Sequence, residues 1–365
     1  MLVGIPKEIK IAESRVAITP EGVREFVAVG HSVIIEDGAG VGSAITNDDY
    51  IASGARILPS ARDIWSQSDL VLKVKEPIAS EYPLMRQDQT LFTYLHLAAS
   101  KECTDALLSS GTTAIAYETV EVDGSLPLLT PMSEVAGRLA TQVGATALQH
   151  PHGGRGVLLG GVPGVAPGRV VVIGGGVSGL NAAIIAVGMG ADVIVLDRSI
   201  NRLQYIDTIY GGRIKTVMAS TQAIEREVRL ADLVIGAVLV HGAKAPKLVS
   251  NALVKTMKSG SVLVDIAIDQ GGCFEDSHPT THADPTFTVH GSIFYCVANM
   301  PGAVPVTSTY ALTNATLPYA LAIARAGWRA ALTHDKNLSK GLNVHAGRIY
   351  YEAVAQAHGY EHAQF

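Results

Sequence analysis

Strand-like and helix-like segments alternate along the N-terminal third of the chain. A helix is predicted to begin at "TPEG", where Thr19 suits the cap and Pro20 the first helical position. Alternation of this kind predicts a mostly parallel sheet with helices on both faces. The short apolar runs that predict its strands are Leu2–Ile5, Ser32–Glu36, Asp69–Val74, Leu91–Leu95 and Thr113–Ala116.

A second alternation begins near residue 169. "RVVVIGGG" predicts a strand that enters a turn, "VSGLNAAIIAVGMG" a helix, and "DVIVLD" the next strand. Four more strand-like segments follow, which suits a complete doubly wound domain of six strands. They are "RIKTVM", "DLVIGAVL", "SVLVDIA" and "IFYCVA".

The linking segments predict how the two alternations are joined. "PMSEVAGRLATQVGATALQ" predicts a long helix, and the tail from Ser308 is helix-like with no further strand series, so we expect it to pack on the first domain. The predicted fold is therefore α/β, with two Rossmann-like doubly wound domains. Residues 130–307 form a dinucleotide-binding domain inserted in a discontinuous substrate domain, residues 1–129 and 308–365.

A glycine pattern follows the first predicted strand of the second domain. Gly174, Gly176 and Gly179 form a GxGxxG sequence between a strand and a helix. Glycines in this context allow a tight turn, close approach of a pyrophosphate, and close helix packing. Asp197 ends the next strand and is placed to accept hydrogen bonds from the adenosine ribose, which favours NAD over NADP; Arg198 and Arg202 lie near enough to receive a 2′-phosphate instead. Alternatively, Asp197 only caps the following helix.

Polar residues follow the predicted strand ends of both domains, where ligands of open α/β sheets bind. Their chemistry suits reduction of a 2-keto acid, because arginine pairs with carboxylates, lysine polarises carbonyls and histidine transfers protons. Spacing does not choose between Lys73 and Lys75, which share a strand face. The candidates are Arg15, Lys75, His96, Asp269 and Asn299.

Composition narrows the function classes. The chain has 365 residues and a net charge of −5, with no basic run for nucleic acid or an anionic membrane. The charge-free stretch from Val170 to Ala191 is interrupted by three glycines, so a strand, turn and helix explain it better than a membrane span. The three cysteines are scattered and form no CxxC pair, which argues against a disulfide framework or a zinc site. Such cysteine usage is typical of a protein in the reducing cytoplasm. His278 and His282 lie in a loop-like segment interrupted by Pro279, which argues against a metal pair.

Longer motifs from one end of the chain to the other resemble the family that comprises L-alanine dehydrogenases and the NAD-binding subunits of proton-translocating transhydrogenases. Their number and order make the resemblance specific. They are "VGIPKE", "ESRVAITPEGV", "GAGVGSAI", "LVLKVKEP", "YLHLAAS", "TPMSEVAGR", "GGRGVLLGGVPGV", "DIAIDQGGCFE" and "YCVANMPGAVPVTSTYALTNATLPY".

The resemblance implies the reversible reaction L-alanine + NAD + water ⇌ pyruvate + ammonia + NADH. It implies that Arg15 and Lys75 hold the substrate, with His96 as acid/base and Asp269 as a second catalytic group. A homohexamer is also implied. The cofactor contacts implied beside the fingerprint glycines Gly174 and Gly179 are Ser133, Gly176, Val177, Asp197, Arg202, Val238, Leu239, Ile266, Ala267, Ile268, Asp269, Val297, Ala298, Asn299 and Met300.

Three alternatives stay open at this point. A soluble transhydrogenase subunit would need membrane spans after the dinucleotide domain or on a partner chain. A non-catalytic NAD(H)-sensing module would not need Arg15, Lys75 and His96 at strand ends. A related amino-acid dehydrogenase would act on another keto acid, such as glyoxylate or 2-ketobutyrate.

Overall fold

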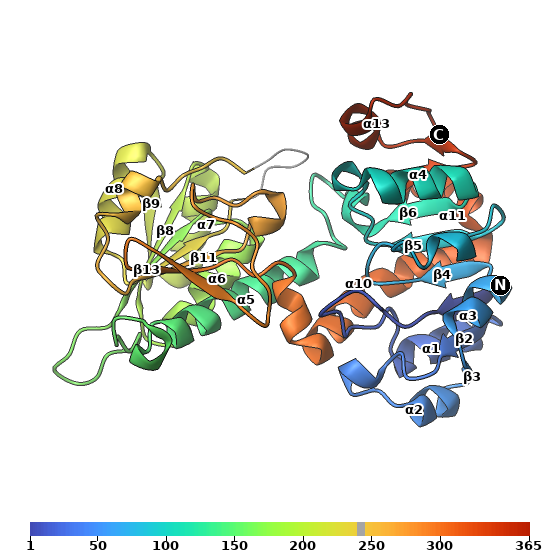
Figure 1. Cartoon of the computed structure of the whole chain (residues 1–365), viewed down its shortest axis with the longest axis horizontal. Helices are drawn as coiled ribbons and strands as arrows, with labels where there is room; N and C mark the ends of the chain where they lie inside the picture. The colour runs from blue at the N-terminus through green and yellow to red at the C-terminus, as the bar shows by residue number, and fades with distance from the viewer. Residues whose placement is uncertain (239–244) are drawn as a thin grey trace. The chain divides into compact units, whose positions relative to one another are not determined.

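The computed structural model describes residues 1–238 and 245–365. The chain forms two compact units, the first made of residues 1–132 and 304–365 and the second of residues 133–303 (Figure 1). The first unit is therefore discontinuous in sequence. Helix α5 (Thr130–Ala147) begins in the first unit and continues into the second, and α10 (Pro305–Ala326) begins shortly after the chain returns.

The first unit contains an eight-stranded sheet in the order β15-β14-β6-β5-β4-β1-β2-β3. Six of these strands are parallel neighbours in the order 3-2-1-4-5-6, the doubly wound topology that alternation predicts. The strands are β1 (Leu2–Ile5), β2 (Ser32–Glu36), β3 (Arg56–Leu58), β4 (Leu70–Leu72), β5 (Thr90–Thr93), β6 (Thr113–Ala116), β14 (Leu342–His345) and β15 (Arg348–Ile349).

Helices cover this sheet, and the first of them begins where predicted. The Thr19 side chain accepts a hydrogen bond from the Gly22 N–H, and Pro20 opens α1. All other helices of the first unit are shorter than α10. They are α1 (Pro20–Ala28), α2 (Asn47–Ala52), α3 (Ala61–Gln67), α4 (Lys101–Ser110), α11 (Trp328–His334), α12 (Lys336–Ser339) and α13 (Glu352–His358).

The second unit contains a seven-stranded sheet in the order β12-β13-β11-β10-β7-β8-β9. Six strands again follow the order 3-2-1-4-5-6, and β12 is added antiparallel at one edge. The strands are β7 (Arg169–Ile173), β8 (Asp192–Asp197), β9 (Ile214–Met218), β10 (Leu233–Gly236), β11 (Val262–Asp265), β12 (Thr286–Val289) and β13 (Ser292–Tyr295). The helices beside α5 are α6 (Val177–Gly188), α7 (Ile200–Tyr210), α8 (Thr221–Leu230) and α9 (Asn251–Val254).

Strand β7 shows why the sheet of the second unit is covered on both faces. Val170 and Val172 are buried in one hydrophobic cluster, whereas Val171 and Ile173 are buried in another. Alternate side chains of a strand point to opposite faces, so a continuous apolar run needs helices on both sides. The predicted α/β class with two Rossmann-like units is confirmed.

Two expectations about the strands are wrong. The tail is not free of strands, because β14 and β15 pair antiparallel beyond β6. "LNVH" is too short and too polar to predict a strand alone, and its pairing with β6 stabilises it. In addition, the strands predicted to end at Val74 and Leu95 end two residues earlier, β4 at Leu72 and β5 at Thr93. Lys75 and His96 therefore lie in the loops and do not directly follow their strands.

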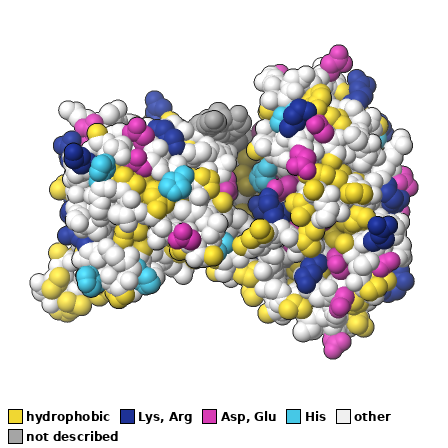
Figure 2. Space-filling view, in the orientation of Figure 1, with side chains coloured by type: hydrophobic (Ala, Val, Ile, Leu, Met, Phe, Trp, Pro, Cys, Tyr) yellow, Lys and Arg dark blue, Asp and Glu magenta, His cyan; other side chains and the backbone are white. Residues whose placement is uncertain are grey.

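The surface of each unit carries both signs of charge. On the face shown in Figure 2, positive and negative side chains are interspersed on both units. Within the part of the chain that the structure describes, no helix combines the length and the apolar character that crossing a membrane requires.

Candidate active site

The turn between β7 and α6 has the geometry of a phosphate-binding loop. Gly174 has φ 99°, where L side chains are strained, and a Cβ on Gly179 would lie 1.8 Å from the Gly174 carbonyl oxygen. Around Gly176, by contrast, a Cβ would meet no atom of the described residues within 4 Å. The first and third glycines are therefore required by the protein itself, whereas the second leaves open space.

The N-terminus of α6 faces that space without a protein cap. Gly176 is the capping residue, so the cap position has no side chain to bond the first turn, and Val177 is the first helical residue. Unpaired N–H groups and the helix dipole favour an anion at such a position. These residues fit the pyrophosphate of a dinucleotide.

Asp197 ends β8 beside this turn. Its carboxylate accepts the Gly175 N–H at 2.6 Å and the Ser199 N–H at 2.8 Å. Ser199 itself caps α7, because its side chain accepts the Arg202 N–H. The alternative that Asp197 only caps the helix is therefore wrong, and its half-buried carboxylate stands at the strand end where a ribose is expected.

The Arg202 side chain also contacts the glycine turn. Its guanidinium donates to the carbonyls of Gly175 and Gly176 and lies over the Tyr205 ring, 5.0 Å from the centroid. These contacts hold the fork against the backbone, which weakens the case that Arg202 receives a 2′-phosphate. Arg198 is exposed and retains that role as an alternative.

The other predicted cofactor residues emerge from neighbouring strand ends of the same sheet. Strands β7, β10, β11 and β13 are adjacent and parallel, so the loops that follow them share one edge. Ser133 is half-buried in the first turn of α5, a helix that approaches α6 at Gly137. Leu239 lies outside the described residues. The loops at that edge carry Val238, Ile266, Ala267, Ile268, Asp269, Val297, Ala298, Asn299 and Met300.

Asp265 is a structural residue of this edge that the sequence did not single out. Its fully buried carboxylate accepts the N–H groups of Ala267, Cys273 and Phe274 and the Ser277 hydroxyl. Burial raises the pKa of Asp265, although these hydrogen bonds oppose the shift. Asp265 therefore organises the loop that presents the exposed Asp269.

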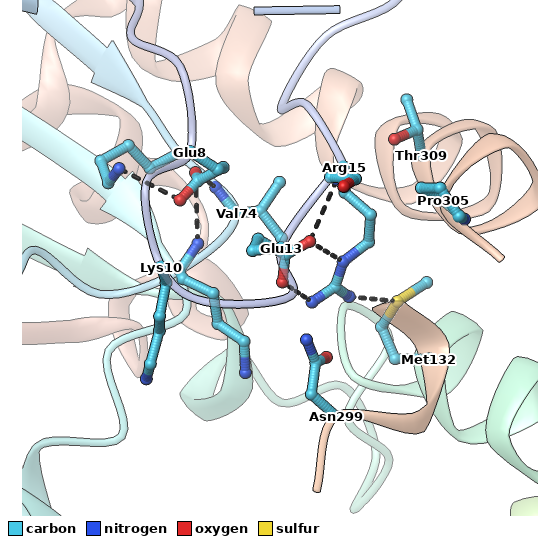
Figure 3. A network of polar contacts seen from close by, with 12 residues as sticks. Glu8, Lys10, Glu13, Arg15, Val74, Met132, Asn299, Pro305 and Thr309 are labelled. Atoms are coloured by element: carbon cyan, nitrogen blue, oxygen red, sulfur yellow. Dashed lines mark hydrogen bonds and ion pairs between the residues drawn. The ribbon is translucent and has the colours of Figure 1, made fainter. Parts of the chain in front are cut away.

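In the first unit, the loop after β1 buries an arginine against a glutamate. The Arg15 guanidinium donates to the two Glu13 carboxylate oxygens at 2.7 and 2.5 Å, and its Nη1 contacts the Met132 sulfur at 3.0 Å (Figure 3). Burial lowers the pKa of Arg15, but the hydrogen bonds to Glu13 outweigh it and the pKa is raised. Glu13, which sequence reasoning missed, orients the predicted substrate arginine.

The structure separates the two lysines that follow β4. The Lys73 side chain is 1% exposed and pairs with Glu8 at 3.1 Å and Glu81 at 2.8 Å. Burial lowers the pKa of Lys73, but attraction to Glu8 and Glu81 exceeds that effect, so the pKa is raised and the lysine stays charged. Lys75 is half-buried. Burial raises the pKa of Glu13, but Arg15 and, to a smaller extent, the charge of Lys75 lower it, so the pKa is lowered overall.

Glu8 joins these two lysines to the loop after β1. Its carboxylate accepts the Val74 N–H at 2.6 Å (Figure 3). It also accepts the Lys75 N–H at 3.4 Å and pairs with the Lys73 ammonium. Lys73 is thus a structural ion-pair residue. Because Lys73 is engaged in that buried ion pair, the half-buried Lys75 stays the predicted substrate lysine.

His96 lies in the loop after β5, next to the loop after β6. Its side chain is 45% exposed, and its backbone has φ 49°, in the left-handed region. The ring stacks on Tyr94, with centroids 5.7 Å apart and planes 8° apart. Backbone strain of this kind costs of order 1–3 kcal/mol and is common at functional sites.

The comparisons identify the family. The description "Alanine dehydrogenase/PNT, N-terminal domain" matches residues 4–136, and "Alanine dehydrogenase/PNT, C-terminal domain" matches residues 140–352. The chain belongs to the alanine dehydrogenase/PNT family.

Curated relatives in this family match almost the whole chain. "Alanine dehydrogenase" of Mycolicibacterium smegmatis is 65% identical over 98% of this chain and 96% of its own length. "Alanine dehydrogenase" of Bacillus subtilis is 54% identical over 99% of this chain and 96% of its own length.

Two solved structures of the family also match. A structure titled "L-alanine dehydrogenase" has a TM-score of 0.96 and 54% identity, covering 98% of this chain and 99% of its own. A transhydrogenase from Sinorhizobium meliloti has a TM-score of 0.82 and 25% identity, covering 97% and 100%. Within the family, the chain is thus far more similar in sequence to the former.

The three cysteines are buried, and His278 lies against an aromatic ring. All three thiols are buried, and burial raises the pKa of Cys273 and Cys296 to about 12, as suits small hydrophobic residues. The His278 ring stacks on Phe287 at 3.8 Å. Among the described residues, no group of three or more His, Cys, Asp or Glu side chains is placed to hold a metal ion.

Proposed function

We propose that the protein catalyses the reversible NAD-dependent oxidative deamination of L-alanine to pyruvate and ammonia. The observation that carries the proposal is 65% identity over 357 residues to a curated alanine dehydrogenase. The glycine turn, the uncapped α6 and Asp197 support NAD as the cofactor. The sequence similarity to the transhydrogenase structure is much lower, at 25% identity, which disfavours a coupling subunit.

In the proposed site, Arg15 and Lys75 bind the substrate. The guanidinium, oriented by Glu13, recognises the pyruvate carboxylate, and the Lys75 ammonium polarises the carbonyl oxygen. Ammonia adds to the polarised carbonyl to give a carbinolamine. Both cations thus hold the substrate in both directions of the reaction.

His96 moves the proton in the proposed mechanism. Its partly exposed ring protonates the departing hydroxyl of the carbinolamine, so that water leaves and an iminium forms. The reduced cofactor, when bound, would supply the hydride that converts the iminium to L-alanine, and the oxidised cofactor would accept that hydride in the reverse direction. Asp269, exposed after β11, is proposed as the second catalytic group. We also propose that the protein is a homohexamer and lies in the cytoplasm. Light scattering after size exclusion tests the oligomeric state, and cell fractionation tests the location.

NADH oxidation with pyruvate and ammonium supplied together, and with each omitted, tests the reaction. We expect turnover only when both are present. Turnover with a keto acid alone would instead indicate a hydroxy-acid dehydrogenase. Bound NADH without any turnover would favour a sensing module or a coupling subunit.

Substitution of His96 by alanine tests the proton transfer. We expect kcat to fall by about 10²- to 10⁴-fold, the usual contribution of a general acid/base. The Kd for NADH should stay unchanged, because the glycine turn belongs to the second unit. Near-normal turnover by His96→Ala would remove His96 from the mechanism.

A further inference from the structure

The loop that carries His96 is held by a carboxylate from the neighbouring strand end. Glu118 lies in a short 3-10 helix (Tyr117–Thr119) that follows β6, and its side chain is 13% exposed. Its Oε1 accepts the His96 N–H at 2.6 Å, and both oxygens lie 3.2 Å from the Leu95 N–H. One carboxylate therefore binds two consecutive peptide groups of the loop.

These hydrogen bonds from two consecutive N–H groups fall where the backbone is strained. His96 has φ 49°, a conformation that a non-glycine residue keeps only when its surroundings enforce it. Hydrogen bonds to an ionised acceptor are roughly twice as strong as those to a neutral one. Glu118 thus offsets the cost of the left-handed conformation from which the His96 side chain projects.

The same carboxylate faces one side of the imidazole. Its Oε1 lies 3.9 Å from His96 Nδ1, beyond hydrogen-bond length but close enough to attract a protonated ring. On its face, the ring stacks on Tyr94, and the Tyr94 hydroxyl is fixed by a 2.5 Å hydrogen bond to the Leu128 carbonyl. Nδ1 is thus the ring nitrogen that has the Glu118 carboxylate as a neighbour, at 3.9 Å, and Nε2 is the other ring nitrogen.

We propose that Glu118 is a positioning residue for His96, which holds the ring so that Nε2 exchanges the proton with substrate. The inference rests on the proposed function, since it assigns a role to a residue that acts through His96. Glu118 contributes in two ways. It fixes the backbone of the loop through the Leu95 and His96 N–H groups, and its Oε1 lies 3.9 Å from Nδ1 on one side of the ring.

The kinetic test compares Glu118→Gln with Glu118→Asp and with Glu121→Gln. Glutamine keeps the size of the side chain and removes the charge, whereas aspartate keeps the charge. Glu121 is a matched control nearby in the chain, with a 2.8 Å ion pair to Lys340 and a side chain 40% exposed. We expect Glu118→Gln to lower kcat about 10- to 100-fold, with KM for pyruvate and Kd for NADH within about threefold of the wild type.

Two comparisons separate positioning from general structural support. Glu118→Asp should retain more activity than Glu118→Gln, and Glu121→Gln should match the wild type. In a His96→Ala background, Glu118→Gln should cause no further loss of kcat, because the residue through which it acts is gone. An additive loss in that background, or an equal loss in the Glu121 variant, would overturn the proposal.

Hydrogen exchange provides a readout that does not need turnover. The amides of Leu95 and His96 should exchange faster in Glu118→Gln than in the wild type and in Glu121→Gln, while the rest of the first unit is unchanged. If the wild type fails to oxidise alanine but these amides lose protection, the proposed function fails and the positioning of His96 stands. If the wild type is active and Glu118→Gln has normal kcat, the positioning role is refuted and the function stands.

Discussion

Replacing each of three glycines in or before α6 by alanine separates the demands of the fold from those of the cofactor. At Gly179, the new Cβ would lie 1.8 Å from the Gly174 carbonyl oxygen, about 1.6 Å short of the 3.4 Å at which ordinary contact begins. At Gly176 and at Gly188, a Cβ would meet no described atom within 4 Å. Only one of the three substitutions therefore forces the protein itself to move.

The expected size of each effect follows from these distances. Gly179→Ala overpacks a backbone contact, which costs about 1–3 kcal/mol of the free energy of unfolding and lowers Tm by roughly 2–12 °C. Gly176 has φ −63° and ψ −162°, allowed for alanine, so Gly176→Ala should change Tm by about 1 °C or less. Gly188→Ala should raise the free energy of unfolding by less than about 1 kcal/mol, because Gly188 is the last residue of α6 and the penalty of glycine in a helix interior applies there only in part.

Cofactor affinity should rank the variants differently. Gly176→Ala fills the space proposed for the pyrophosphate and should raise the Kd for NADH about 10- to 100-fold, the equivalent of one lost charged hydrogen bond. Gly188→Ala should leave Kd unchanged and serves as the control within the same helix. Calorimetry without cofactor gives Tm, and titration of NADH fluorescence gives Kd. Wild-type NADH affinity in Gly176→Ala would refute the cradle, and an unchanged Tm in Gly179→Ala would refute the packing argument.

Two further predictions concern other groups. Asp197→Ser removes a carboxylate that accepts hydrogen bonds at 2.6 and 2.8 Å. The Kd for NADH should rise about 10- to 100-fold, and the ratio of the Kd values for NADPH and NADH should fall. Paired titrations with the two cofactors measure both effects, and an unchanged ratio would contradict the ribose role. The three thiols are buried with pKa values raised to about 12, so at pH 8 only about one in ten thousand is a thiolate. The native protein should therefore react with Ellman's reagent far more slowly than the denatured chain, and rapid reaction of a native thiol would contradict this burial.

The central strands and the glycine turn were predictable because their signals are local. Strand β8 spans Asp192–Asp197, the same residues as the "DVIVLD" run, since a parallel strand buried on both faces needs a continuous apolar segment. The long helix α5 and the start of α1 likewise follow from apolar pattern and capping residues within one segment. In contrast, β14 depends on pairing with β6, a partner more than 200 residues away.

The residues that sequence reasoning missed act through contacts that spacing does not reveal. Glu118 reaches His96 only because β5 and β6 are neighbours in the sheet. Lys73 and Lys75 are equivalent by periodicity, and only the Glu8 and Glu81 carboxylates distinguish the buried lysine from the half-buried one. Glu13 was visible two residues before Arg15, but a bidentate pair could not be told from an exposed glutamate without the burial of both.

The two units share one strand order but offer different chemistry at their strand ends. In the second unit, the loop after the first strand consists of glycines, so the backbone itself reaches the ligand and suits the phosphates of a dinucleotide. In the first unit, the corresponding loop carries buried charges such as Glu8, Glu13 and Arg15, and under the proposed function recognition depends on side chains. Because the topology is the same, it does not decide what each unit binds; the loop sequences do.

A cradle of small residues accepts a large anion through N–H groups, whereas a set of mutually oriented ion pairs selects a small carboxylate by charge and geometry. A glycine variant should therefore impair cofactor binding while the substrate residues keep their contacts, and a Glu118 variant should impair proton transfer while the cofactor still binds.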